Sequence, residues 1–443
     1  MIDWYLILFV AITLIIFHMK EFGEHPDSAR YIQDRATVPV SAGTMQLLFR
    51  LMTGTFLFIP FYFTITYGYL AGLALALAGA AVLLSFGSLV EELSGNSPFT
   101  EGRQSFVESR FSKKGLIAFY ILAMAAGAEG LLISTLLASE FLKQTFGISP
   151  YMAAIPVLGF SFIFAGMGGT RGLRKVGTWL IMMFFTGITI LPLSAFLING
   201  AKPIYLALYA KNGANMDLWQ LLIGVLLFMP VLAGQLLIYL LLSSDLLSIK
   251  SNKVKLSVRL GSISWSSIPL AVSLIVLYLL SITESSSASG LLAGLKENMP
   301  VLLVYVLVFV VLSGFVIGVG LSLYIMTSLM FTAFPGIVST QKGYLFSLIL
   351  SLIPLTIVNS SLLSLESILI FFMNLFASMA LPLWLTVKAK VRWGIEFASV
   401  ILLSAVFGSW SSMHYGWMIG IPFNLGVSSL AIIILLIRNI RKI

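Results

Sequence analysis

Residues 49–60 read Phe-Arg-Leu-Met-Thr-Gly-Thr-Phe-Leu-Phe-Ile-Pro, an apolar run that Gly54 and Pro60 interrupt. Proline removes a backbone donor and clashes with the carbonyl group four residues earlier, and glycine lowers the cost of an unwound turn. In a bilayer such a break persists only where the freed backbone groups find partners, often around a bound solute or ion. The stretch therefore predicts a membrane helix that is broken near its middle.

A second stretch of this kind lies further along the chain. Residues 221–235 read Leu-Leu-Ile-Gly-Val-Leu-Leu-Phe-Met-Pro-Val-Leu-Ala-Gly-Gln, with Pro230 and Gly234 inside the run. Two interrupted helices five segments apart indicate a transporter built from inverted repeats, with its site near the bilayer midplane. The alternative is a pair of kinked structural helices, because proline is common in membrane helices.

The composition places the whole chain in a membrane. Of its 443 residues, 59% are hydrophobic and 10% are charged, whereas a soluble domain carries about 25% charged residues. The apolar segments are continuous rather than alternating, so we expect helices and not barrel strands. The chain has no cysteine, which excludes disulfides and thiolate metal sites. No enzyme motif such as HExxH or a nucleophile elbow occurs, so we expect no enzyme.

About thirteen apolar segments are each long enough for ~30 Å of hydrocarbon. They are residues 3–19, 45–66, 69–90, 115–142, 149–168, 174–199, 217–244, 261–282, 300–333, 343–361, 365–387, 394–413 and 417–437. All but four of the 26 Lys and Arg residues then lie on one side, the exceptions being Lys143, Lys202, Lys211 and Lys296. This asymmetry predicts an outside N-terminus and a cytoplasmic C-terminus, and the net charge of +9 fits loops that face anionic lipid.

Four stretches, in order, resemble the solute:sodium symporter family. They are Gly54 to Pro60 with Tyr67-Gly-Tyr-Leu-Ala-Gly; residues 99–111, Phe-Thr-Glu-Gly-Arg-Gln-Ser-Phe-Val-Glu-Ser-Arg-Phe; Gly168-Gly-Thr-Arg-Gly-Leu-Arg; and Gly234-Gln235 followed by Ser243-Ser-Asp and a basic loop. The resemblance implies an all-α polytopic protein with a LeuT-type core of two inverted five-helix repeats. We expect an N-terminal helix and loop at 1–44, repeats at 45–199 and 217–387, and two further helices with a basic tail at 388–443.

The chain departs from this family where sodium would bind. The family usually carries two adjacent hydroxyl residues in its eighth core helix, which ligate sodium together with backbone carbonyls of the first. An ungapped alignment places Gly318 and Val319 there, and neither offers a side-chain oxygen. Ser322 and Thr327 are the next hydroxyl candidates, with helix packing as their alternative role. The resemblance favours sodium coupling, whereas this departure favours protons.

Glu129 is a carboxylate near the centre of a predicted span. It follows Lys114 by about fifteen residues, or ~22 Å along a helix axis. An ionised side chain at that depth costs at least ~2.5–3.5 kcal/mol, so such residues are functional candidates by default. Glu129 is a coupling group that exchanges protons, a fixed counter-ion for a cationic substrate or sodium, or a structural acid hydrogen-bonded to a neighbouring helix. The sequence leaves these three interpretations open.

The remaining candidates flank the two interruptions. Thr53, Gly54 and Thr55 lie at the first, and Gln235 follows the second. Each offers a polar group to a solute, although hydroxyl bonding within the helix and interhelical packing of the amide are alternatives. With Glu129, they are the expected substrate site, and Glu129, Ser322 and Thr327 are the ion-coupling candidates.

These observations lead us to expect secondary transport of a small organic solute across the cytoplasmic membrane by alternating access, coupled to sodium or protons. The expected partners are the solute and membrane lipid, with no nucleic acid and no cofactor other than the coupling ion. The alternative is a transporter-derived protein that no longer transports and serves as a sensor or as the membrane subunit of a protein complex.

Overall fold

The computed structural model describes residues 31–32, 39–52, 55–95, 102–202, 204–206, 217–242, 251–283, 287–334, 338–359, 364–389 and 391–440. Within these ranges, 11 helices are long and apolar enough to cross a membrane, or 12 if the bent pair α3 (Val40–Leu51) and α4 (Thr55–Tyr67) counts as one span. The chain is therefore a multi-pass, all-α membrane protein, as predicted. The first predicted segment, 3–19, lies outside the described residues.

The other helices follow the predicted spans closely. In chain order they are α5 (Ala71–Gly95), α6 (Gly102–Arg110), α7 (Lys113–Phe146), α8 (Pro150–Ser161), the π-helix η2 (Phe162–Met167), α9 (Gly169–Asn199), α11 (Leu218–Leu242), α12 (Ser251–Ile282), α13 (Ala288–Ala293), α14 (Leu295–Asn298), α15 (Val301–Ala333), α16 (Thr340–Asn359), α17 (Leu365–Lys388), α18 (Glu396–Tyr415) and α19 (Trp417–Ile440).

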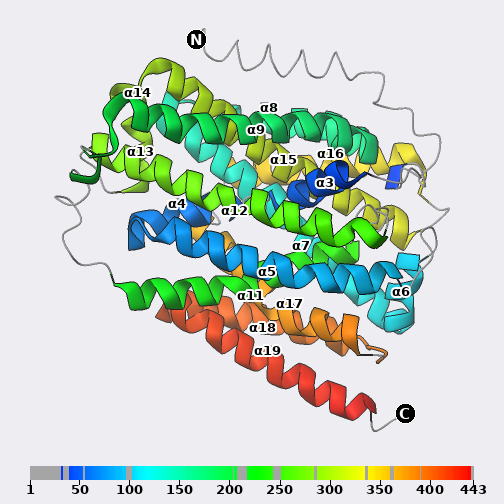
Figure 1. Ribbon diagram of the computed structural model, residues 1–443. Helices are drawn as coiled ribbons and strands as arrows, with labels where there is room; N and C mark the ends of the chain where they lie inside the picture. Colours follow the sequence, from blue (N-terminus) through cyan, green and yellow to red (C-terminus); the bar gives the residue numbers. More distant parts are fainter. Residues whose placement is uncertain are drawn as a thin grey trace.

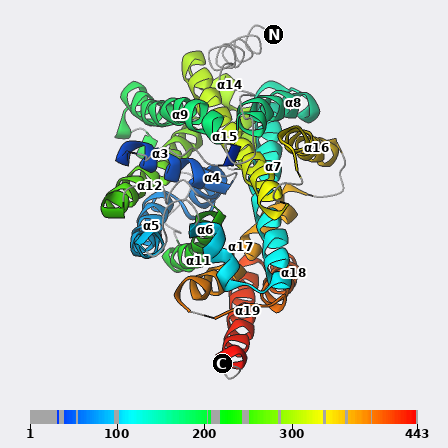
Figure 2. The same ribbon diagram turned by 90° about the vertical axis from the view of Figure 1, so that its right-hand side faces the viewer.

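The long helices run along a common axis, with the short α6 at one end and α13 and α14 at the other (Figure 1). We call these the α6 end and the α13 end. The asymmetry of the basic residues predicts that the α6 end faces the cytoplasm. Viewed along the axis, α15 lies within the bundle and α19 projects from its edge (Figure 2). Accordingly, α15 is the most buried of the spans and α19 is among the least.

The two longest helices pack against each other through small residues. α7 has 34 residues and α15 has 33, and a Cβ atom at Gly130 of α7 would lie 2.5 Å from Ser322 Oγ and 2.6 Å from the Gly318 carbonyl oxygen of α15. Only glycine allows the two backbones to approach this closely. The sequence predicted the great length of both segments, and their packing places the centre of α7, with Glu129, inside the protein.

The pattern of helix packing is symmetrical. α5 packs along α12 and α7 along α15, while α3 packs on α12 much as α11 packs on α5. Two related five-helix units would make such paired contacts. The division of the chain into repeats at 45–199 and 217–387 stays a prediction.

The first predicted break is present, because α3 and α4 meet at a bend of 63°. The second prediction is wrong: α11 continues from Leu218 to Leu242 with Pro230 inside it. Gly234 has a different role from the predicted one, since a Cβ atom there would overlap the carbonyl oxygen of Phe376 in α17. The glycine provides close helix packing rather than an unwound turn.

Candidate functional site

Three helices meet at the break between α3 and α4. A Cβ atom at Gly318 of α15 would lie 3.3 Å from the carbonyl oxygen of Met52, which ends the described part of α3, and would overlap Ser134 Oγ of α7. The backbone of α15 therefore reaches the broken helix directly, with α7 beside it. We call this contact of Met52, Ser134 and Gly318 the junction.

Glu129 of α7 is fully buried and lies close to the hydroxyl group of Tyr239 in α11. Gln235, one helical turn before Tyr239, lies close to the same hydroxyl group, and Arg50 of α3 interacts with it electrostatically. All four side chains are buried, Arg50 with only 4% of its surface exposed. Three helices thus bring two opposite charges, a phenol and an amide together inside the protein. We call these four residues the polar cluster.

The polar cluster can perform the chemistry that a solute or coupling-ion site requires. Inside a protein, charges act on each other far more strongly than in water, so protonation of Glu129 would change the electrostatic balance with Arg50. The Tyr239 hydroxyl group can donate to a carboxylate, and the Gln235 amide can both donate and accept. The cluster can therefore hold a proton or bind the polar group of a solute.

The other predicted site residues lie at different places. Thr53 and Gly54 lie outside the described residues, between α3 and α4, and Thr55 is the buried first residue of α4. Ser322 packs against Gly130 on the α7–α15 interface. Thr327 is buried further towards the α6 end, beside Tyr31. Glu129 and Gln235 are thus brought together, whereas Ser322 packs against the residue after Glu129 and Thr327 lies beside Tyr31.

Two members of the polar cluster were not among the predicted site residues. Arg50 interrupts the apolar run 45–66, a few residues before the break, so its charge was visible in the sequence. Tyr239 follows Gln235 by four residues, which places both on one face of a helix. Only the packing of α11 against α7 shows that this face meets Glu129.

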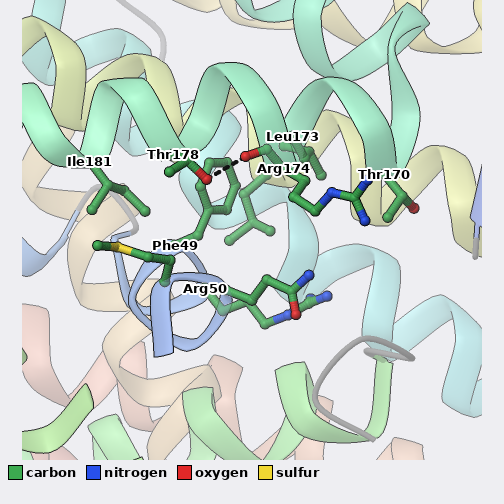
Figure 3. Close-up of a pocket in the computed structure, with 10 residues that line it drawn as sticks. Phe49, Arg50, Thr170, Leu173, Arg174, Thr178 and Ile181 are labelled. Carbon is green, nitrogen blue, oxygen red and sulfur yellow. Dashed lines mark hydrogen bonds between the residues drawn. The ribbon is translucent and has the colours of Figure 1, made fainter. Parts of the chain in front are cut away.

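A small cavity of about 30 Å³ lies between α3 and α9, on the α6 side of the junction. Figure 3 shows Phe49 and Arg50 of α3 opposite Arg174 and Thr178 of α9. This volume is about that of one water molecule. Beside it the Phe49 ring packs so tightly on Gly177 that a Cβ atom there would overlap the ring. Among the described residues, α3 and α9 are thus packed too closely at this cavity to admit an organic solute.

Tyr31 closes the same end of the protein. Its hydroxyl group donates to the carbonyl oxygens of Ala165 at 3.2 Å and Gly166 at 3.0 Å, within the π-helix η2. Thr170 Oγ1 donates to the Tyr31 carbonyl oxygen at 2.9 Å, and Gly169 adopts a φ of +53° directly under the Tyr31 ring. The Gly168-Gly169 turn therefore packs against Tyr31, which precedes α3 in the chain.

A much larger cavity, of about 400 Å³, lies towards the α13 end. It is bounded by α4, α7, α9, α12, α13, α15 and the start of α17, and it is large enough for a small organic molecule. Among the described residues, no group of three or more His, Asp or Glu side chains could hold a metal ion.

The comparisons with known proteins concern the fold. A Na+-coupled sialic acid symporter, solved in a substrate-bound outward-open state, matches with a TM-score of 0.70 and 13% identity over 97% of this chain and 96% of that chain. A manganese transporter from Eremococcus coleocola, solved with an aromatic bis-isothiourea substituted compound, matches with a TM-score of 0.55 and 14% identity over 95% of this chain and 99% of that chain. No protein-family profile and no curated protein matches the chain.

The LeuT-type fold predicted from the sequence is thereby confirmed, and the chain is a divergent example of it. Both of these structural neighbours are transporters and not enzymes. The count of thirteen spans and the orientation of the termini stay predictions.

Proposed function

We propose that the protein is a secondary transporter that moves a small organic solute across the cytoplasmic membrane by alternating access. The observation that carries this proposal is the buried polar cluster beside the bend of 63° between α3 and α4. Opposite charges are expensive to bury in a membrane and are kept where they bind substrates, ions or each other. Broken helices near the midplane are typical of solute sites in transporters.

The unequal cavities support alternating access. The space towards the α13 end is about 400 Å³, and the space between α3 and α9 is about 30 Å³. A protein that opens to one side at a time requires one open and one closed side in each state. Movement of α3 away from α9, with release of Tyr31, would open the α6 end.

Sodium or protons are the proposed coupling ions, and the site favours protons. Gly318 approaches the Met52 carbonyl oxygen, where a side-chain oxygen would be needed for sodium, and Ser134 leaves no room for a larger residue at 318. Glu129, by contrast, is a buried carboxyl group that can gain and lose a proton. The carboxyl group would couple solute movement to a proton gradient through its contact with Tyr239.

The second candidate is a sensor or a membrane subunit of a complex that binds a solute without moving it. The absence of a side-chain oxygen at Gly318 and Val319 favours this alternative, because it removes a sodium-coupled driving force. The two candidates differ in flux and not in binding.

A thermal-shift screen followed by uptake measurements would test the proposal. The detergent-purified chain is screened against amino acids, sugars, carboxylates, amines and nucleobases, with sodium or potassium and at two pH values. A ligand at 100 times its Kd stabilises the folded state by about 2.7 kcal/mol. Accumulation of that ligand in proteoliposomes under an imposed ion or pH gradient supports transport, whereas saturable binding without flux supports the sensor.

A further inference from the structure

The large cavity lies directly next to the junction. Its lining includes Leu57 of α4, Leu137 of α7 and Phe315 of α15. Leu137 and Phe315 lie about one helical turn, or ~5 Å, from Ser134 and Gly318 respectively, each displaced towards the α13 end, and Leu57 lies in the first turn of α4. The cavity therefore begins next to the junction, on the side that faces the α13 end.

The lining is almost entirely apolar. Aliphatic and aromatic side chains of α4, α7, α12 and α15 form most of it, and the polar lining residues are Glu140, Gln144 and Ser289. Among the described residues that line the cavity there is no Lys, Arg or His. Gln144 donates to Glu140 Oε1 at 2.6 Å, and Lys143 Nζ is 3.7 Å from Glu140 Oε2. Both partners of this ion pair are about half exposed, so it neutralises the carboxylate only weakly.

The Glu129 carboxyl group lies on the same face of α7 as Glu140. Glu129 precedes Glu140 by eleven residues, which is close to three full turns of an α-helix. The face of α7 that lines the cavity thus continues towards the polar cluster, and it carries a carboxyl group at Glu140 and another at Glu129.

We propose that the cavity selects an apolar organic solute that carries a single amine, such as an arylalkylamine. This inference rests on the proposed transport function and names its substrate class. The apolar walls take the ring or alkyl body, and the Glu140 carboxylate in the lining attracts the ammonium group. A carboxylate solute is repelled by Glu140 and finds no basic side chain among the described lining residues.

The same lining excludes polyhydroxylated solutes. A hydroxyl group that is buried without a hydrogen-bond partner loses its interactions with water and gains none. The polar lining residues lie on α7 and α13 and cannot serve several hydroxyl groups around a sugar ring. The solute of this protein therefore differs in class from sialic acid, which the structural neighbour carries.

Binding of four related probes to the purified full-length chain tests the proposal. The probes are tryptamine, the uncharged tryptophol, the anionic indole-3-acetate, and N-acetylneuraminic acid, each measured by calorimetry and melting temperature. Tryptamine is expected to bind about tenfold or more tightly than tryptophol, with no binding of the two acids. Equal affinity for tryptamine and tryptophol, tighter binding of either acid, or binding of none of the probes would overturn the proposal.

Two variants locate the binding. Val272→Trp fills the cavity from α12 and is expected to abolish tryptamine binding, whereas Leu193→Trp on the exposed face of α9 leaves it unchanged. Glu140→Gln is expected to retain tryptophol binding and to remove most of the preference for the amine. Melting curves without ligand confirm that each variant folds, and tryptamine binding that survives in a folded Val272→Trp protein overturns the assignment.

Uptake separates this inference from the function on which it rests. Tryptamine that binds in the cavity without entering proteoliposomes contradicts transport and leaves the binding class standing. Uptake of a different solute that Val272→Trp does not impair supports transport and overturns the amine site.

Discussion

The hydroxyl group of Tyr239 in α11 lies close to the carboxyl group of Glu129 in α7, and both side chains are buried. The contact joins a helix of the first predicted repeat to a helix of the second. A change in the protonation of Glu129 therefore alters a contact between the two predicted repeats. Ion-coupled movement of one repeat relative to the other requires such a contact.

Glu129→Gln is expected to reduce proton-driven uptake at least tenfold while the melting temperature changes by only a few degrees. Glutamine retains the shape of the side chain but cannot gain or lose a proton. Uptake into proteoliposomes with an imposed pH gradient measures the effect, and Glu366→Gln, at an exposed position in the first turn of α17, is the control. Normal pH-dependent uptake by the Glu129 variant would show that this residue is not the coupling group.

Sodium is expected to give no saturable stabilisation of the purified protein. Gly318 and Val319 provide no side-chain oxygen beside the Met52 carbonyl group, so a sodium ion there would lack the two hydroxyl ligands that the family's eighth core helix usually supplies. The melting temperature is measured over a sodium titration, with potassium at equal ionic strength as the control. A shift that is specific to sodium would show that our interpretation of Gly318 and Val319 is wrong.

Tyr31→Phe is expected to open the α6 end more often. The substitution removes the bifurcated hydrogen bond from the Tyr31 hydroxyl group to Ala165 and Gly166, which is worth about 0.5–1.5 kcal/mol, and so favours the open state several-fold. The chain contains no cysteine, so Thr178→Cys, in the small cavity between α3 and α9, can be labelled alone with a methanethiosulfonate reagent.

The labelling rate of Thr178→Cys should rise several-fold in the Tyr31→Phe background. A matched Leu57→Cys protein, labelled in the cavity towards the α13 end, should show no such rise. An unchanged rate at Thr178→Cys would mean that Tyr31 does not hold this end closed.

Gly234→Ala is expected to destabilise the protein by about 1–3 kcal/mol or more, because overpacking forces neighbouring atoms to move. A Cβ atom at 234 would overlap the backbone oxygen of Phe376, which cannot rotate away as a side chain can. Gly159→Ala in α8 is the control, since no atom lies within 4 Å of a Cβ atom there. Chemical unfolding in detergent compares the two, and equal stability of both variants would contradict the close packing of α11 on α17.

The positions of the membrane helices could be predicted because they depend on the length and hydropathy of continuous segments. The break between α3 and α4 was predicted on the same local basis, from Gly54 and Pro60. Pro230 and Gly234 had the same local signature and led to a wrong prediction. Gly234 is needed because the Phe376 carbonyl group of α17 packs against it and leaves no room for a side chain. A glycine in the sequence does not show whether it serves an unwound turn or close helix packing.

The sequence by itself determined that the chain crosses a membrane many times and that Glu129 lies deep within a span. These properties follow from the cost of exposing backbone and charged groups to lipid, which each segment meets alone. The tertiary structure decided that Glu129 meets Tyr239 and Gln235, that Arg50 joins them, and that the α6 end is closed while a large cavity lies towards the α13 end. Those properties arise from packing between segments far apart in the chain, where the fit of one helix against another determines which side chains meet.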